Sequence, residues 1–227
     1  MATHATTGAR DRPCSYRAGV TWDAFLQEHL PEPPARVLEI GCGSGELTTS
    51  LAVAGYDAVG IDPAAPQGDR FRRLKLEDVE DDPRWDAVVA ARSLHPLTDL
   101  ESALDKVVGL LEPDGVLVVE EFGWDFLDEQ TLDWFWGQRR AIAAADGTPA
   151  PGSPEELRAE WEADRVGMHG HAALRAALDA RFEEIAFETA PFLHRVLGGV
   201  ATEVLEQALI DAGAIRALGF RFAGRPR

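Results

Sequence analysis

Residues 37–47 read Val-Leu-Glu-Ile-Gly-Cys-Gly-Ser-Gly-Glu-Leu, an apolar run that leads into three alternate glycines. Val37, Leu38 and Ile40 give this run the apolar, partly β-branched character of a buried parallel strand. The glycines carry no Cβ where the chain must turn sharply, so a ligand can lie against the backbone there. A helix that begins near Glu46 would direct its free N–H groups at that ligand. The stretch therefore predicts a strand, a ligand-binding turn and a helix.

The spacing of the glycines distinguishes between the ligands that such a turn can bind. The dinucleotide fingerprint G-x-G-x-x-G, counted from Gly41, would place its third glycine at Glu46. A carboxylate there would face a pyrophosphate, which argues against NAD and FAD. The pattern is instead Glu-x-Gly-x-Gly-x-Gly, and it resembles motif I of the class I S-adenosylmethionine-dependent methyltransferases. In that motif an acidic residue, here Glu39, precedes the first glycine by two positions, and the resemblance extends over about residues 36–121.

The resemblance implies an α/β protein with a three-layer, Rossmann-like fold, in which a seven-stranded, mostly parallel sheet has an antiparallel last strand. It also implies S-adenosylmethionine as the cofactor and S-adenosylhomocysteine as its product. Residues 1–12 are polar and lack an apolar period, so we expect them to form a flexible tail. Residues 13–227 are then the methyltransferase domain.

The pattern between residues 123 and 180 departs from a minimal domain of this class. Four of the six tryptophans lie in this interval, among segments with helical periodicity. We therefore predict a helical lid at 123–180 that binds the methyl acceptor. An aromatic lining favours a flat or apolar small molecule as that acceptor.

The composition restricts the partners that the protein can have. Of its 227 residues, 39 are acidic and 22 are basic, which gives a formal net charge of −17 at pH 7. Phosphate backbones would be repelled, so we expect a small-molecule acceptor and no nucleic acid. No apolar run approaches the length of a membrane span, so we expect no membrane association and a cytoplasmic protein. We expect a monomer or a homodimer.

Metal chemistry has little support in the sequence. The two cysteines, Cys14 and Cys42, cannot form a cysteine-rich metal site or a disulfide framework. His169 and His171 are separated by one glycine, a far weaker signal than the H-E-x-x-H pattern of zinc enzymes. We therefore predict no metal site.

A carboxylate ends the second predicted strand. Asp62 lies 17 residues beyond Gly45 and is followed by Pro63. Such a carboxylate can accept hydrogen bonds from both ribose hydroxyls, and the resemblance implies this role for Asp62. The resemblance also implies an acid that accepts a hydrogen bond from the adenine amino group. Glu77 or Asp78 fits that position, and the sequence does not choose between them.

The remaining cofactor contacts follow from the resemblance alone. Ala91 and Arg92 end the strand predicted at 85–91 and should flank the methionine amine. Tyr16 and Arg17 precede the first predicted helix and are candidates to contact the methionine part. The predicted cofactor-binding residues are Tyr16, Arg17, Glu39, Gly41, Cys42, Gly43, Asp62, Pro63, Glu77, Asp78, Ala91 and Arg92.

Three residues are candidates for the proton removal that a poorly acidic hydroxyl or a carbon acid requires of a general base. His95 lies in Leu-His-Pro, which resembles the Leu-His-His turn of the family, and we predict it as the base or as the group that orients the acceptor. A histidine that caps a helix, or is buried against the backbone, would look the same in the sequence. Glu121, at the tip of the strand predicted at 116–122, and His169 are the second choices.

These observations predict a methyltransferase that acts on a small molecule, with oxygen favoured over nitrogen and carbon as the acceptor atom. The alternative is a protein of the same fold that binds S-adenosylmethionine without transferring methyl, either a cyclase-like enzyme or a partner or regulatory subunit. The residues of motif I suit both hypotheses. A methylated product distinguishes them.

Overall fold

The computed structural model describes residues 21–80 and 84–227, apart from the side chains of residues 200 and 201. The tail predicted at 1–12 lies outside the described residues. So do Tyr16 and Arg17, the two residues expected to contact the methionine part of the cofactor.

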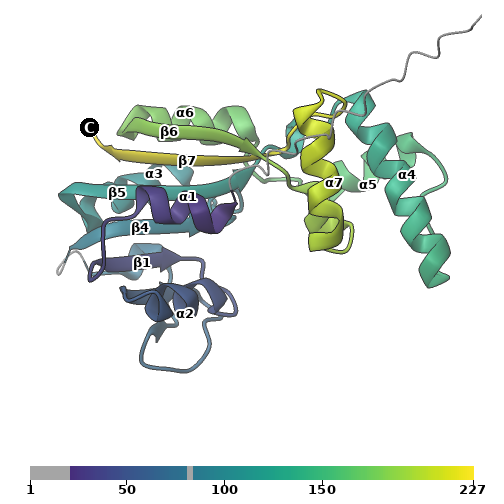
Figure 1. The fold of residues 1–227 in the computed structure, drawn as a ribbon. Helices are drawn as coiled ribbons and strands as arrows, with labels where there is room; N and C mark the ends of the chain where they lie inside the picture. The colour runs from purple at the N-terminus through teal and green to yellow at the C-terminus, as the bar shows by residue number, and fades with distance from the viewer. Residues whose placement is uncertain (1–20, 81–83) are drawn as a thin grey trace, which may run out of the picture.

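One sheet of seven strands organises the molecule (Figure 1). Strands β1 to β5 are mutually parallel where they pair, whereas β7 is antiparallel to both β5 and β6. The strand order is β3-β2-β1-β4-β5-β7-β6. This arrangement confirms the predicted fold, including the antiparallel last strand. The strands are β1 Arg36–Ile40, β2 Asp57–Ile61, β3 Phe71–Arg72, β4 Trp85–Ala91, β5 Leu111–Phe122, β6 Phe182–Ala190 and β7 Gly219–Pro226.

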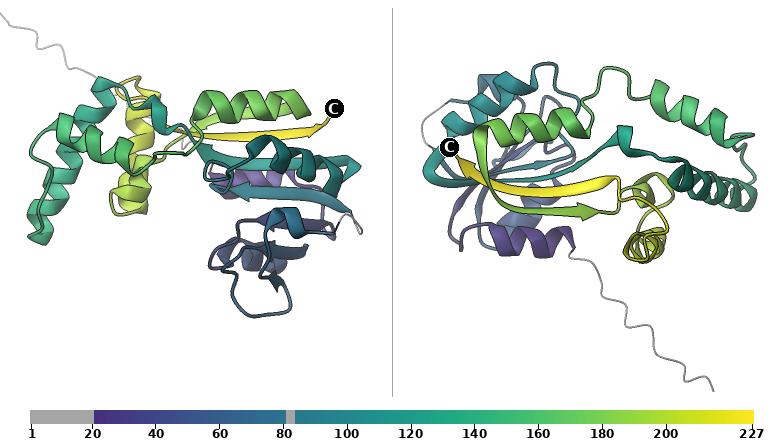
Figure 2. Two further views of the ribbon diagram at one scale, coloured as in Figure 1. Left: turned by 180° about the vertical axis from the view of Figure 1, so that it is seen from behind. Right: turned by 90° about the horizontal axis from the view of Figure 1, so that it is seen from above.

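Helices cover both faces of the sheet, because the central strands are apolar on both faces. In β4, Ala87, Val88, Val89 and Ala90 are all fully buried, and successive residues belong to cores on opposite faces. Helices α3 and α6 pack on one face, while α1 and α2 pack on the other (Figure 2). The helices are α1 Trp22–His29, α2 Glu46–Val53, α3 Leu100–Leu110, α4 Glu129–Asp146, α5 Pro154–Ala163, α6 His171–Arg181 and α7 Val200–Asp211.

A helical unit, made of α4, α5 and α7, lies beyond the end of the sheet at which β5 ends (Figures 1 and 2). It has its own core, in which Phe135, Leu157 and Trp161 pack with Phe122 and Phe192. None of the described helices is long and apolar enough to cross a bilayer.

The bounds of this helical unit differ from the lid predicted at 123–180. Helix α6 lies inside that interval, yet Leu174 and Leu178 on one of its faces are buried in the same core as Leu104 of α3. Helix α6 therefore belongs to the layer that covers the sheet. Helix α7, which the interval leaves out, joins the helical unit through the connection between β6 and β7.

Candidate active site

The glycine turn between β1 and α2 has the open backbone that the sequence predicts. Gly41, Gly43 and Gly45 have φ angles of 72°, 51° and 83°, a region that residues with side chains rarely adopt. A Cβ on Gly41 would lie 2.4 Å from Cβ of Ser93, and one on Gly45 would lie 2.4 Å from the ring of Phe71. A Cβ on Gly43 would meet no atom of the described residues within 4 Å. The backbone at Gly43 therefore faces open space that a ligand can fill.

The carboxylate of Asp62 lies against this turn, at the tip of β2. Its Oδ2 accepts a hydrogen bond from the N–H of Gly43 at 3.2 Å, and its Oδ1 accepts one from the N–H of Ala64 at 2.7 Å. The carbonyl of Ile61 accepts the N–H of Gly41 at 2.8 Å. A carboxylate has about four acceptor positions, so two remain for the hydroxyls of a ribose. Asp62 thus ties the glycine turn to β2 and keeps capacity for a ligand.

Glu39 and Cys42 lie beneath the turn. Glu39 is 4 % exposed and accepts a hydrogen bond from the hydroxyl of Thr48 in α2. Burial raises the pKa of Glu39, and burial together with nearby carboxylates raises the pKa of Cys42 to about 11. Neither side chain lines the cavity beside the turn. Both side chains therefore lie beneath the turn and not in the cavity. Gly43 is also absent from the lining residues, and the contact of these three residues with the cofactor stays a prediction.

A cavity of about 630 Å³ opens beside the turn. Of the two residues predicted to bind the adenine amino group, Glu77 lines the cavity and Asp78 does not. Ala91, at the end of β4, is not among the lining residues. The predicted residues that do line the cavity are Gly41, Asp62, Pro63, Glu77 and Arg92, and its apolar walls come from Ile40, Ile61, Leu74, Leu76, Pro96 and Leu97.

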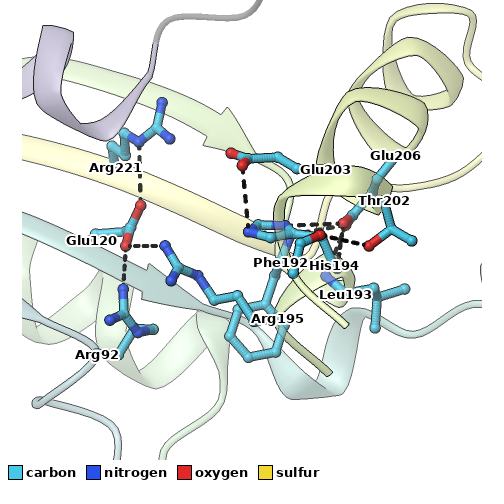
Figure 3. Close-up of polar contacts among 11 residues, drawn as sticks. Arg92, Glu120, Phe192, Leu193, His194, Arg195, Thr202, Glu203, Glu206 and Arg221 are labelled. Atoms are coloured by element: carbon cyan, nitrogen blue, oxygen red, sulfur yellow. Dashed lines mark hydrogen bonds and ion pairs between the residues drawn. The ribbon is translucent and has the colours of Figure 1, made fainter. Parts of the chain in front are cut away.

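Arg92 leaves the end of β4 in an unusual conformation. It is the only non-glycine residue with positive φ (58°) among the described residues, and its N–H donates to the carbonyl of Glu120 at 2.7 Å. Its guanidinium pairs with the side chain of Glu120, which also pairs with Arg195 at 2.9 Å and with Arg221 at 3.6 Å (Figure 3). One buried carboxylate thus meets three guanidinium groups.

His95 is held by the buried carboxylate of Glu121. Nδ1 of His95 lies 2.9 Å from Oε2 of Glu121, while the N–H groups of Leu94, His95 and Phe122 donate to the same carboxylate at 2.8, 3.2 and 3.2 Å. Glu121 is 1 % exposed. An ionised carboxylate can only accept, so the proton of a neutral imidazole lies on Nδ1 and Nε2 is left as an acceptor. Glu121 therefore holds the ring of His95 in place, and it lines neither of the two cavities.

A second cavity of about 330 Å³ lies at the edge of the helical unit. Phe122 and Phe192 form its apolar wall, with their rings stacked at 3.8 Å between centroids. The His95 ring meets Phe122 edge-on at 4.8 Å. Arg92 lines both cavities, so the two adjoin at its side chain. The complete lining of the second cavity is Arg92, His95, Phe122, Asp164, Arg165, Met168 and Phe192.

His169 supports the His95 segment from outside both cavities. Its Nε2 lies 2.8 Å from the carbonyl of Leu97, and its N–H donates to the carbonyl of His95 at 2.9 Å. The ring of His171 packs against those of Phe126 and Phe220, at 4.1 and 5.1 Å between ring centroids. The described residues contain no group of three or more His, Cys, Asp or Glu side chains that could hold a metal.

The sequence analysis did not identify five residues that line the second cavity: Phe122, Asp164, Arg165, Met168 and Phe192. Phe192 and Arg195 lie in the turn after β6, which Glu206 of α7 holds by accepting the N–H groups of Phe192, Leu193 and His194 (Figure 3). Nothing in the periodicity of this turn indicates a site. Arg165 follows Trp161 by four residues, a spacing that on a helix can bring a guanidinium over an aromatic ring. This spacing is the one signal for Arg165 in the sequence.

The chain is similar to known methyltransferases. The family model described as a methyltransferase domain matches residues 10–184. The ubiquinone biosynthesis O-methyltransferase of Rhodopseudomonas palustris is 30% identical over 97 residues, which are 37% of this chain and 38% of that protein. An uncharacterized methyltransferase of Mycobacterium bovis is 33% identical over 130 residues, 53% of this chain and 51% of that protein. The chain thus matches about two fifths to one half of the length of these relatives.

Solved structures share the fold at low sequence identity. An S-adenosylmethionine-dependent methyltransferase from Mesorhizobium loti has a TM-score of 0.57 and 17% identity, over 91% of this chain and 98% of that one. The [4+2]-cyclase SpnF has a TM-score of 0.54 and 16% identity, over 89% of this chain and 78% of that one. The chain therefore belongs to the methyltransferase domain family, the S-adenosylmethionine-dependent class I methyltransferases that the sequence predicted.

Proposed function

We propose that the protein transfers a methyl group to an oxygen atom of a small molecule bound in the cavity beside His95. One observation carries this proposal. A histidine oriented by a buried carboxylate lines a small aromatic cavity that adjoins the cofactor cavity at Arg92.

The residues around the glycine turn fit S-adenosylmethionine. The open backbone at Gly43 can approach the methionine part, Asp62 retains acceptor positions for the ribose, and Glu77 lines the cavity among apolar walls that suit adenine. When bound, the cofactor supplies a sulfonium methyl group, whose carbon–sulfur bond breaks with its electron pair kept by sulfur as the acceptor oxygen forms the new carbon–oxygen bond.

The protein contributes alignment and a base. Holding the reactants at near-attack distance can lower the activation free energy by about 7 to 11 kcal/mol. Nε2 of His95 accepts the proton of the acceptor hydroxyl, and the ionised Glu121 at Nδ1 stabilises the imidazolium that forms. Glu121 is a positioning residue in this scheme.

The size and the charge of the site support a small acceptor. A cavity of about 330 Å³ is at the lower end of the range for small-molecule pockets. The net charge of −17 disfavours a nucleic acid substrate. Oxygen as the acceptor atom is supported by the base at the cavity, since amines require less help with proton removal, and by the name of the O-methyltransferase that matches part of the chain.

Two measurements test the proposal. In the first, methyl-labelled S-adenosylmethionine is incubated with the protein and a panel of phenols and catechols, and we expect S-adenosylhomocysteine and a labelled methyl ether in equal amounts. In the second, calorimetry follows S-adenosylhomocysteine binding, and we expect Asp62→Ala to weaken it about 10- to 100-fold through loss of charge-assisted hydrogen bonds. Binding with no methylated product would support the non-transferring alternative, and unchanged affinity of the variant would remove Asp62 from the site.

A further inference from the structure

The second cavity is lined by a cationic side chain, Arg165, that has no role in the proposed reaction. Resting on the function proposed above, we propose that the methyl acceptor is a planar aromatic acid, whose carboxylate binds Arg165 while its hydroxyl lies at His95. Arg165 is then the residue that selects the acceptor.

The guanidinium of Arg165 has a fixed position. Arg165 follows the end of α5, and its Cζ lies 3.4 Å from the ring centroid of Trp161, within stacking distance. Its Nη1 donates to the carbonyl of Trp161 at 2.8 Å. Stacking on one face and a hydrogen bond at one nitrogen leave little freedom, so the guanidinium is preorganised for a ligand.

The opposite edge of this guanidinium has unused hydrogen-bonding capacity. Nε of Arg165 is buried and has no hydrogen-bond partner among the described residues. Nη1 is occupied by the carbonyl of Trp161, and on the other edge of a guanidinium the N–H of Nε lies parallel to one N–H of Nη2. A carboxylate matches this fork with two charge-assisted hydrogen bonds.

The charge balance around Arg165 also differs from that around Arg175 and Arg181, two other half-buried arginines. Each of these two pairs with a carboxylate at 2.8 Å or less. No carboxylate of the described residues pairs with Arg165 within 4 Å, although Asp164 lines the same cavity and acts on it at longer range. Burial lowers the pKa of Arg165. A ligand carboxylate would compensate a desolvated cation that the chain leaves without a close partner.

The shape of the cavity indicates where the ring of the ligand lies. The rings of Phe122 and Phe192 stack with an interplanar angle of 6° and form a flat apolar wall. The ring centroid of His95 lies 4.8 Å from that of Phe122, and Cζ of Arg165 lies 5.9 Å from the Phe122 centroid. The base and the cation thus flank the same ring. A flat molecule with a hydroxyl at one end and a carboxylate at the other satisfies both groups.

The test compares acids with matched neutral amides. Calorimetry measures binding of 3,4-dihydroxybenzoate and 3,4-dihydroxybenzamide to the protein saturated with S-adenosylhomocysteine, and repeats the comparison with 3,4-dihydroxycinnamate and its amide. We expect at least one acid to bind tenfold or more tightly than its amide. Arg165→Met should abolish this preference, while Arg165→Lys, which keeps the charge but not the fork, should retain part of it. The affinity for S-adenosylhomocysteine should stay unchanged in both variants.

Arg140 provides the matched control. Its guanidinium lies over Trp136 at 4.6 Å, as Arg165 lies over Trp161, but Arg140 lines neither cavity. Arg140→Met should leave the acid preference intact. Equal binding of acids and amides, no binding of either acid, or a preference that persists in Arg165→Met would overturn the inference. Failure of the wild-type protein to bind S-adenosylhomocysteine would instead contradict the proposed function itself.

Discussion

Nδ1 of His95 lies 2.9 Å from Oε2 of Glu121, and the same carboxylate accepts three backbone N–H groups from both sides of the site. These N–H groups belong to the turn after β4 and to the end of β5, so one side chain joins the strands that carry the histidine and the aromatic wall. The arrangement separates two effects that mutations can measure. One is the proton removal that we propose for His95, and the other is the orientation of His95 by Glu121.

His95→Gln removes the base while keeping a polar side chain of similar size. We expect kcat to fall about 10²- to 10⁴-fold, the usual contribution of a general base. The affinity for S-adenosylhomocysteine should stay within about twofold, because His95 lines only the second cavity. Steady-state kinetics and calorimetry check the two expectations. A wild-type rate at saturation would assign His95 to packing.

Glu121→Gln keeps the shape of the buried side chain but replaces one acceptor oxygen by an amide donor. Four donors converge on the carboxylate, so the amide must face at least one N–H group and leave it unsatisfied. We expect the free energy of unfolding to fall by about 1 to 3 kcal/mol, together with a lower kcat. Urea denaturation measures the first effect. Glu129→Gln, which breaks a pair with Arg158 at an exposed carboxylate, should change stability by no more than about 1 kcal/mol.

Gly43→Ala tests whether the open backbone of the turn is the cofactor site. The added Cβ meets no described atom, so the protein should fold, with a cost of about 1 to 2 kcal/mol for a side chain at positive φ. Affinity for S-adenosylhomocysteine should fall at least tenfold, because the methyl group occupies the space of the ligand. Gly41→Ala, whose Cβ would overlap Ser93, should instead lose more stability. If Gly43→Ala binds as the wild type does, the ligand does not lie against this turn.

The cofactor half of the site could be predicted because its signals are local in the sequence. The spacing of Gly41, Gly43 and Gly45 and the position of Asp62 each follow directly from a strand that ends at the same edge of the sheet. The burial of Glu39 and Cys42 could not be predicted, because it depends on how α2 packs over the turn. That Glu77 and not Asp78 lines the cavity depends on the short helical turn at Leu76–Asp78, which follows β3.

The acceptor half could not be predicted, because its residues meet only through tertiary packing. Phe122 and Phe192 are 70 residues apart in the chain and stack at 3.8 Å. The turn that carries Phe192 depends on Glu206 of α7, and a polar residue in an amphipathic helix gives no sign of burial. For the same reason α6 falls inside the lid predicted at 123–180, since its periodicity shows an apolar face and only contact with α3 assigns it to the sheet.

His171→Phe tests a pH-dependent contribution to stability. Burial lowers the pKa of His171, with Asp125 opposing the shift and two arginines adding to it. Because the pKa is lower in the folded state than its ordinary value of 6.5, the unfolded state binds the proton more readily. The full free energy of unfolding is therefore present above pH 6.5. Part of it is lost as the pH falls from 6.5 through the pKa of His171 in the folded protein. Urea denaturation at pH 7.5, 6.5 and 5.5 should show a smaller loss in His171→Phe than in the wild type. Phe135→Leu, which changes a buried ring that packs on Trp161, should lower stability by a similar amount at every pH. An unchanged pH dependence in His171→Phe would contradict the prediction.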